Sequence, residues 1–227
     1  MALNYISTNQ FQQVHGVKAA VYGASGTGKT TLASTLPGPI IISIESGLLS
    51  LRKHNIPVLL ATTLQDFKDA YAWLTQSQDA AQFQSVMIDS VSELAEKVLE
   101  QKLLSNKDGR KAYGEMQQEL VPWIKGFRDL PNKNVLMTFK EEYIKDEFTG
   151  MMKWAPSMPG KQLIKDVPYW FDELFRAHVM IDPNTGERKH YLQCQKIDAN
   201  EAKDRSGVLD VWETPDMSAI FSKIANS

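Results

Sequence analysis

A glycine-rich segment near the start of the sequence combines residue types that bind phosphate. Residues 23–30 read GASGTGKT and match the pattern GxxxxGK[ST]. The glycines let the backbone curve closely around an anion, so that its N–H groups point at phosphate oxygens. Lys29 can reach the β- and γ-phosphates, and the Thr30 hydroxyl is suited to Mg²⁺. We expect ATP and Mg²⁺ as ligands, with the following residues around the phosphates: Gly23, Ala24, Ser25, Gly26, Thr27, Gly28, Lys29, Thr30 and Thr31.

Two carboxylates follow apolar runs and could act on the same nucleotide. Asp89 ends the run SVMID, where it could hold Mg²⁺ together with Thr30, directly or through water. Glu45 follows the run IIISI and could position and deprotonate a water that attacks the γ-phosphate. Plainer interpretations remain open, since Asp89 could be a helix cap and Glu45 an exposed strand-end residue.

The first elements of the chain explain how these residues could be positioned. Residues 17–23 predict an apolar strand that ends at the glycine-rich turn, after which residues 29–36 continue as a helix until Pro37 ends it. Residues 40–44 are nearly all β-branched, which is typical of a parallel strand buried on both faces. Residues 58–61 are a shorter candidate strand.

Helix and strand continue to alternate in the middle of the chain. Thr63 can cap a helix whose apolar residues recur from Leu64 at helical spacing, and residues 85–89 predict the next strand. Ser90 and Glu93 then predict a capping box at the start of another helix. The acidic end of residues 85–89 therefore lies at the carboxyl end of a strand.

A further helical stripe covers residues 113–127, with a kink or restart expected at Pro122. Residues 134–139 predict a strand after it. Later, residues 173–181 and 188–195 alternate like strands around strong turn chemistry at 182–186. The pattern predicts an α/β fold: a mostly parallel sheet with helices on both faces, extended by a C-terminal antiparallel hairpin.

Composition sets limits on the class of protein. The length of 227 residues suits a single domain, which we divide into an N-terminal extension (1–16), a core (17–195) and a C-terminal segment (196–227). A formal charge of −2 means that any nucleic-acid contact must come from local basic patches. The lone Cys194 and the absence of a signal peptide or a long apolar run favour a cytoplasmic protein with no membrane contact.

Histidine and tryptophan give no further chemical signal. His15, His54, His178 and His190 have no metal-ligand spacing, and the tryptophans lie at helical or strand positions that are typical of core packing. We assign these residues no chemistry.

The order of the glycine-rich segment, the IESGL motif that contains Glu45, and VMIDS resembles the core of RecA recombinase over roughly residues 17–195. More closely, the chain resembles compact phage RecA-like ATPases, a family that includes ATP-dependent single-strand-annealing proteins. The segment Ala202-Lys203-Asp204-Arg205 is part of this likeness. The resemblance implies a RecA-like P-loop NTPase core, with Glu45 as the catalytic base, and the cytoplasm of a bacterial host if a phage encodes the protein.

The same resemblance implies roles for three basic residues. Lys140 stands where RecA carries a glutamine that senses the γ-phosphate, and this departure leaves its sensing role open. Lys203 and Arg205 are candidates for a finger that reaches the nucleotide of a neighbouring subunit, with a solvated loop as the plainer alternative. A homo-oligomer with nucleotide at its subunit interfaces is implied as well.

RecA-like proteins bind DNA through two mobile loops, which correspond here to residues 105–114 and 142–160. Both segments are polar and long, and each could instead be an ordinary solvated loop. Basic and aromatic side chains in them suit a contact to phosphates and stacked bases. The candidates are Lys107, Arg110, Lys111 and Tyr113 in the first segment and Lys145 and Lys153 in the second, where Phe148 and Trp154 could stack or anchor the loop.

The function expected from this sequence is a DNA-stimulated ATPase that acts on single-stranded DNA in phage recombination or strand annealing, with a single-strand-binding protein as a further partner. An alternative is a nucleotide-switched loader or packaging ATPase that does not bind DNA itself. A small-molecule kinase is less favoured because no arginine cluster could form its lid. A GTPase is disfavoured because Asn106-Lys107-Asp108-Gly109 departs from the base-reading motif NKxD.

Overall fold

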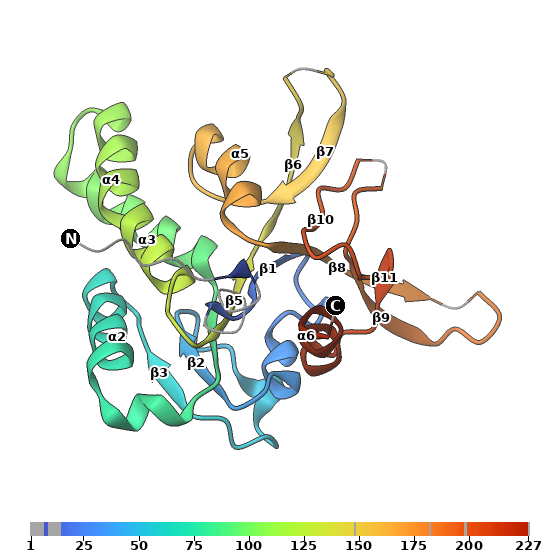
Figure 1. The fold of residues 1–227 in the computed structure, drawn as a ribbon. Coiled ribbons are helices and arrows are strands. Elements are labelled where there is room, and N and C mark those ends of the chain that lie inside the picture. Colours follow the sequence, from blue (N-terminus) through green and yellow to red (C-terminus); the bar gives the residue numbers. More distant parts are fainter. Residues whose placement is uncertain (1–6, 9–14, 148, 182, 198, 227) are drawn as a thin grey trace.

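The computed structural model describes residues 7–8, 15–147, 149–181, 183–197 and 199–226 (Figure 1). Most of the predicted N-terminal extension lies outside these residues. Phe148 and the first residue of the predicted turn at 182–186 lie outside them too.

One sheet runs through the described part of the chain, in the order β11-β9-β8-β1-β5-β4-β2-β3, with β10 paired to β8. The six strands from β8 to β3 in this order pair in parallel, and β9, β10 and β11 pair antiparallel to their neighbours. The predicted parallel sheet with an antiparallel C-terminal hairpin is therefore confirmed. The strands are β1 (Lys18–Tyr22), β2 (Pro39–Ser43), β3 (Val58–Leu60), β4 (Ser85–Asp89), β5 (Asn134–Phe139), β8 (Glu173–Ile181), β9 (Arg188–Gln193), β10 (Lys203–Asp204) and β11 (Trp212–Glu213).

Helices cover both faces of the sheet, and strand periodicity divides the core accordingly (Figure 1). Along β1, Ala20 and Tyr22 pack into one apolar cluster and Ala19 and Val21 into the other, as expected for side chains that alternate between faces. The cluster that contains Ala20 is covered by α2 (Leu64–Gln76), α3 (Val91–Ser105), α4 (Gly109–Arg128) and α5 (Lys161–Trp170), and η3 (Gln78–Gln82) also contributes to it. The cluster that contains Ala19 is covered by η1 (Thr30–Thr35), η2 (Leu49–Leu51) and α6 (Met217–Ala225).

The helix starts show which local predictions hold. Thr63 and Asp66 form a reciprocal capping box at the start of α2. At α3, Ser90 Oγ accepts the Glu93 N–H at 3.3 Å, but the Glu93 carboxylate binds Lys140 instead of turning back to the cap. The predicted box is therefore only half formed, because a charged partner competes for its glutamate.

Two helix predictions hold in part. The segment after the glycine-rich turn is helical as predicted, but it is a 3₁₀ helix, η1, that covers Thr30–Thr35 within the expected residues 29–36. Its threonine and serine hydroxyls bond to carbonyls three residues back, which is the spacing of the tighter turn. α4 runs from Gly109 to Arg128 without a restart at Pro122. A broad apolar face holds the helix together across the missing N–H of the proline.

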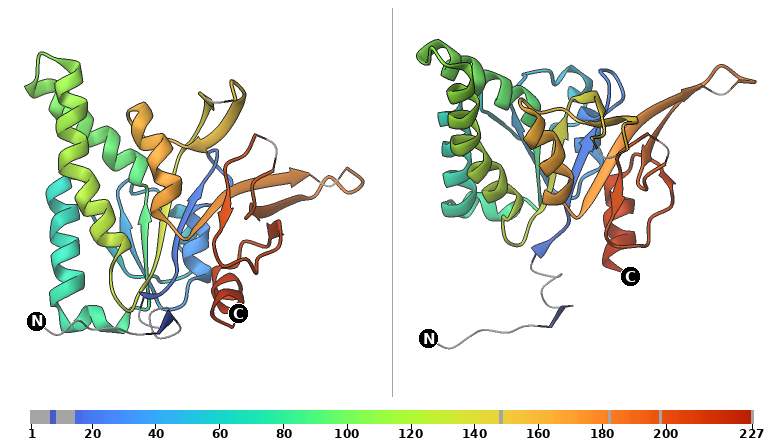
Figure 2. Two further views of the ribbon diagram at one scale, coloured as in Figure 1. Left: turned by 45° about the horizontal axis from the view of Figure 1, so that its top comes forward. Right: turned by 90° about the horizontal axis from the view of Figure 1, so that it is seen from above.

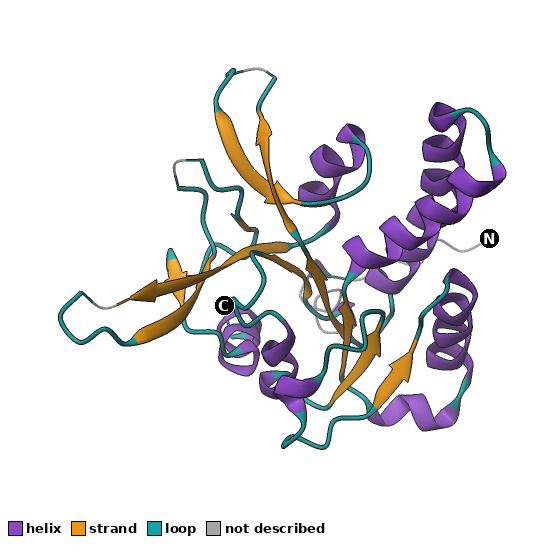
Figure 3. Ribbon diagram, turned by 180° about the vertical axis from the view of Figure 1, so that it is seen from behind, coloured by secondary structure: helices purple, strands orange, loops and turns teal. Residues whose placement is uncertain are grey.

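Both predicted loops are more ordered than expected. In place of the first loop, predicted over residues 105–114, the structure has a short turn between α3 and α4. Helix α4 begins early because Asp108 caps it by accepting the Arg110 N–H. The second contains the hairpin of β6 (Glu141–Lys145) and β7 (Met152–Pro156), which stands apart from the main sheet (Figure 3). The rings of Tyr143 and Trp154 pack across this hairpin with centroids 4.8 Å apart. The turn of α3–α4 and the β6–β7 hairpin both project beyond the carboxyl ends of the parallel strands (Figure 2, left).

Candidate nucleotide-binding site

The glycine-rich segment forms a tight loop between β1 and η1, at the carboxyl end of a central strand. Gly26 and Gly28 have φ angles of 78° and 90°, a backbone conformation that residues with a Cβ rarely adopt. At Gly23 a Cβ would meet the Ala177 carbonyl oxygen at 2.8 Å. The loop can therefore curve as a phosphate cradle only because these positions lack side chains.

The ammonium group of Lys29 folds over this loop. Its Nζ donates to the carbonyl oxygens of Gly23 at 2.7 Å and Ala24 at 2.8 Å. Burial lowers the pKa of Lys29, and the negative charges of nearby carboxylates, led by Asp89, oppose that shift. The Lys29 side chain is thus held against the loop, in the cavity that these carboxylates also line.

Asp89 lies at the carboxyl end of β4, buried beside the loop. Its Oδ2 accepts the hydroxyl of Thr30 at 2.6 Å, and its Oδ1 accepts the hydroxyl of Thr138 on β5 at 2.5 Å. The peptide bond between Asp89 and Ser90 is cis. A hydroxyl and a carboxylate in direct contact form a donor set that suits Mg²⁺, which prefers oxygen ligands.

Glu45 lies just after β2 and is exposed at the rim of the same cavity. Its Oε1 accepts the hydroxyl of Ser90 at 2.5 Å, so a residue of the neighbouring strand end orients the carboxylate. Ser90 also caps α3, which fixes its own position. The arrangement supplies a solvent-facing base close to Asp89.

Lys140 and Glu141 line the site from the end of β5. Lys140 Nζ bridges Glu93 at 2.8 Å and Glu96 at 2.5 Å on α3. Burial would lower the pKa of Lys140, but these two carboxylates raise it overall. Glu141 accepts two N–H groups of Arg176 at 3.2 and 3.0 Å, and this guanidinium lies 4.7 Å from the Trp154 ring centroid.

These groups share one open cavity of about 820 Å³. The cradle, the ammonium group and the hydroxyl–carboxylate pair fit a nucleoside triphosphate with Mg²⁺. The cavity is lined by residues 23–31, Glu45, Gly47, Ser50, Asp89, Ser90, Lys140, Glu141, His190 and Pro215. The residues predicted to bind the nucleotide or the metal ion within one chain, together with Glu45 and Lys140, therefore all line this one cavity.

The structure places His190, which received no role from the sequence, beside the phosphate loop. His190 on β9 reaches the loop, and its Nδ1 lies 3.0 Å from the Thr27 carbonyl oxygen. The position in sequence carries no motif, because the contact depends on how β9 pairs with β8. The contacts of Thr138 with Asp89 and of Ser90 with Glu45 were not predicted either. Both arise because the carboxyl ends of neighbouring parallel strands meet at one edge of the sheet.

The predicted DNA-contacting residues lie on two projections. Lys107 is exposed in the α3–α4 turn, and Arg110 and Tyr113 are exposed on the first turns of α4. Lys111 is exposed there as well, 3.7 Å from Glu115. On the hairpin, Lys145 is exposed.

Lys153 differs from these residues because it is engaged within the chain. Its Nζ contacts Asp146 at 3.1 Å and Glu201 at 2.9 Å. The two carboxylates neutralise its charge, which weakens it as a contact to DNA.

Lys203 and Arg205 lie away from the phosphate loop of their own chain. β10 pairs with the first residues of β8, at the amino end of the parallel strands. Lys203 Nζ donates to the carbonyl oxygen of Pro168 at 2.7 Å and to that of Phe171. Arg205 pairs with Asp172 at 2.7 Å and is exposed. A role toward a neighbouring subunit remains a prediction.

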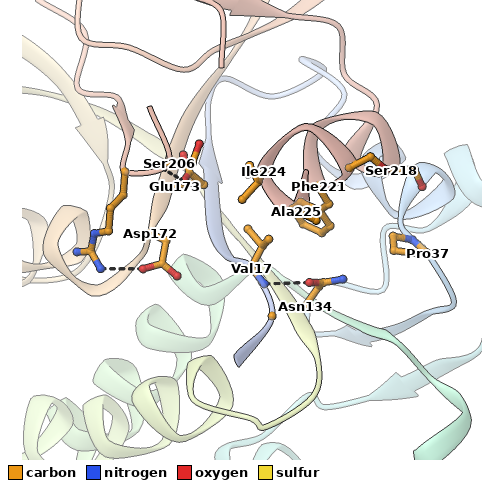
Figure 4. A pocket seen from close by; sticks show the side chains of 13 residues that line it. Val17, Pro37, Asn134, Asp172, Glu173, Ser206, Ser218, Phe221, Ile224 and Ala225 are labelled. Atoms are coloured by element: carbon orange, nitrogen blue, oxygen red, sulfur yellow. Dashed lines mark hydrogen bonds and ion pairs between the residues drawn. The ribbon is translucent and has the colours of Figure 1, made fainter. Parts of the chain in front are cut away.

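A second cavity of about 750 Å³ lies at that amino end, between β8, the segment after β10, and α6 (Figure 4). Glu173 on its wall is buried. Among the described residues, its Oε2 is the one fully buried side-chain nitrogen or oxygen atom without a hydrogen-bond partner. Burial raises the pKa of Glu173 to about 8, and the negative charge of Asp204 adds to the shift. Asp204 lies directly opposite in the strand pair.

The described residues contain no group of three or more histidine, cysteine, aspartate or glutamate side chains that could hold a metal ion by themselves. No helix among them is long and apolar enough to cross a membrane.

The mostly parallel sheet and the glycine-rich loop at its carboxyl edge define a RecA-like P-loop NTPase fold. The model of a protein family described as "AAA domain" matches residues 15–206 of this chain. The chain therefore belongs to this family, whose members are P-loop ATPases that bind nucleotide. No curated protein matches the sequence.

Three solved structures are similar to this chain at low sequence identity. An ATPase from the type III secretion system of pathogenic bacteria is 15% identical, with a TM-score of 0.51 over 75% of this chain and 55% of the ATPase. A KaiC-like protein, PH0186, from Pyrococcus horikoshii OT3 is 14% identical, with a TM-score of 0.45 over 86% of this chain and 88% of its own. The RadB recombinase is 18% identical, with a TM-score of 0.46 over 82% and 86%.

Proposed function

We propose that this protein hydrolyses ATP and acts on single-stranded DNA in recombination or strand annealing. The observation that carries the first part is the convergence of Lys29, Thr30, Asp89 and Glu45 on one cavity around a glycine-rich loop. Membership of the AAA domain family supports it.

In this proposal the loop amides and Lys29 bind the phosphates of ATP. Lys29 exchanges its two carbonyl partners for the β- and γ-phosphate oxygens. Thr30 and Asp89 would hold Mg²⁺, which when bound supplies positive charge beside the phosphates. Lys140 lines the same cavity and is the candidate γ-phosphate sensor, at present held by Glu93 and Glu96.

Glu45 acts in the hydrolytic step. Its carboxylate orients a water and accepts its proton as the water oxygen bonds to the γ-phosphorus and the bond to the β-phosphate oxygen breaks. The products are ADP and inorganic phosphate. Ser90 holds the carboxylate through one oxygen and leaves the other for the water.

The proposed DNA contact centres on the turn of α3–α4. Lys107 and Arg110 are exposed there, and the ring of Tyr113 is 39% exposed, enough to stack on a base. The turn projects on the nucleotide side of the sheet (Figure 2, left). Lys145 on the β6–β7 hairpin is a further contact, and Glu141 in the site begins that hairpin, which connects the two regions covalently.

We further propose a homo-oligomer in which Lys203 or Arg205 approaches the nucleotide of an adjacent subunit. The likeness of the segment 202–205 to phage RecA-like ATPases supports this assignment. A single-strand-binding protein is a proposed partner on the same DNA.

Steady-state ATP hydrolysis with and without a single-stranded oligonucleotide tests the proposal. We expect the DNA to raise the rate several-fold, and the double variant Lys107→Ala/Arg110→Ala to lose that stimulation while its DNA-free rate is kept. Removing two phosphate contacts should also lower the slope of log K against log salt by roughly 1.4.

The matched control is Lys53→Ala/Lys196→Ala, which removes two exposed charges elsewhere and should respond like wild type. Hydrolysis that DNA does not stimulate would contradict the DNA part of the proposal. That result would instead favour a nucleotide-switched interaction protein.

A further inference from the structure

The two sides of the phosphate loop differ in chemistry. β1, which carries the loop, lies between β5 and β8 in the sheet. On the β5 side, Asp89, Glu45 and Lys140 gather the groups that act on the γ-phosphate and the metal ion. The wall of the cavity toward β8 and β9 carries none of these three groups, which leaves it for the nucleoside end of a bound nucleotide. This argument rests on the proposed function.

His190 lies on that second side. Its Nδ1 is 3.0 Å from the Thr27 carbonyl oxygen, and because a carbonyl only accepts, this nitrogen carries the proton. A Cβ placed on Gly28 would be 3.2 Å from the same nitrogen and 3.3 Å from Thr31 Oγ1. The exposed ring thus lies against the loop, and Nε2 is the ring nitrogen that this contact does not use.

Pro215 lines the same cavity from the segment between β11 and α6. The start of α6, two residues after Pro215, is bonded to η1: the Met217 N–H donates to Thr35 Oγ1 at 3.0 Å, and the Ser218 hydroxyl donates to the Thr35 carbonyl oxygen at 2.5 Å. The pyrrolidine ring is therefore held at a fixed place beside the helix that follows the loop.

We propose that His190 and Pro215 form the nucleoside subsite of this protein. The flat imidazole and the apolar pyrrolidine supply packing surface for a heteroaromatic base, and the imidazole Nε2 accepts a hydrogen bond from a base amino group or a ribose hydroxyl. The subsite thereby determines preference for a nucleoside triphosphate over the bare phosphate chain.

Binding of two probes by calorimetry tests the subsite: ATP, and inorganic tripolyphosphate, each with Mg²⁺. We expect His190→Ala to weaken ATP binding by about 10-fold or more, with tripolyphosphate binding unchanged within about 2-fold. Pro215→Ala should show the same pattern. His190→Phe keeps a flat ring and should retain most of the preference for ATP.

The control is Lys189→Ala. Lys189 precedes His190 on the same strand, so its side chain points to the opposite face of the hairpin. It should bind both probes like wild type. Equal weakening of both probes by His190→Ala would overturn the proposal, because the histidine would then only shape the loop. Loss of ATP preference in His190→Phe would overturn the packing role. Wild type that binds neither probe would refute the proposed function itself.

Discussion

The two ends of the parallel strands carry cavities of similar size and different chemistry. The one at the carboxyl end measures about 820 Å³ and the one at the amino end about 750 Å³. The first is built around backbone N–H groups of a glycine-rich loop, an ammonium group and hydroxyl-bound carboxylates. The second lies between apolar side chains of α6 and the acidic residues Asp172 and Glu173, of which Glu173 is buried (Figure 4). Volume alone therefore does not mark a site, whereas converging polar groups do.

A buried carboxylate at each end makes the contrast specific. Both oxygens of Asp89 accept a threonine hydroxyl, an arrangement that holds the anion ready for a cation. Glu173 has one oxygen without a partner and a pKa raised to about 8 by burial. The first carboxylate is thus fully hydrogen-bonded at the cavity of the phosphate loop, whereas burial keeps the second as a neutral acid at pH 7.

The largest effect should follow from removing the base at the carboxyl end. Glu45→Gln should lower kcat by about 10²- to 10⁴-fold, because the amide cannot accept the water proton, and should leave ATP affinity nearly unchanged. Single-turnover hydrolysis with a separate ATP binding measurement checks both numbers. Glu100→Gln, on an exposed position of α3, is the control. Normal turnover in Glu45→Gln would remove Glu45 from this role.

The next effect concerns the metal ligand. Asp89→Asn keeps the volume and a contact to Thr138, but it loses the negative charge beside Thr30. The Mg²⁺ concentration needed for half-maximal hydrolysis should rise by about 10- to 100-fold. A Mg²⁺ titration of wild type and variant measures this shift, and an unaltered midpoint would show that Asp89 acts only as a structural acceptor.

A smaller effect should come from the loop backbone. Gly28→Ala places a methyl 3.2 Å from His190 Nδ1 at a φ of +90°, so we expect ATP affinity to fall by about 10-fold. Gly47→Ala is the matched control, since it lines the same cavity, has no neighbour within 4 Å and has no positive φ. Equal affinities of the two variants would argue against a required loop conformation.

The smallest effect concerns stability at the amino end. The pKa of Glu173 is raised from 4.5 to about 8, so the folded protein keeps this proton to a higher pH than the unfolded chain does. The resulting stabilisation is complete below about pH 4.5 and is lost as the pH rises toward 8.

Glu173→Gln stays neutral at every pH, so at pH 8.5 the variant should be more stable than wild type by roughly 1 kcal/mol or more. Urea unfolding at pH 6 and pH 8.5 measures the difference, and ATP hydrolysis should not change. A variant with the same pH dependence as wild type would show that another group is responsible.

The sequence was sufficient to predict what depends on local pattern. The loop from Gly23 to Thr30 has a fixed spacing, and Asp89 and Glu45 each end an apolar run, so parallel pairing brings all of them to one edge. The buried strands also follow from their apolar runs. These parts of the site needed no knowledge of distant contacts.

The remaining parts depend on tertiary pairing that no local pattern encodes. His190 reaches the loop only because β9 folds back along β8, in a register that pairs it with Val179. The β6–β7 hairpin lies in a segment for which the sequence predicts a polar loop, because cross-strand contacts such as Tyr143 with Trp154 stabilise it. Hydroxyl-to-carbonyl bonds in η1 likewise favour a 3₁₀ turn, a helix type that the sequence pattern did not specify.

The most direct test of the central claim is ATP hydrolysis by wild type and Lys29→Ala under saturating Mg²⁺. If the ammonium group binds the phosphates from its position over the loop, wild type releases inorganic phosphate and the variant is slower by about 10²-fold or more. Equal rates in the two proteins, with both correctly folded, would contradict the assignment of this loop as the site of ATP hydrolysis.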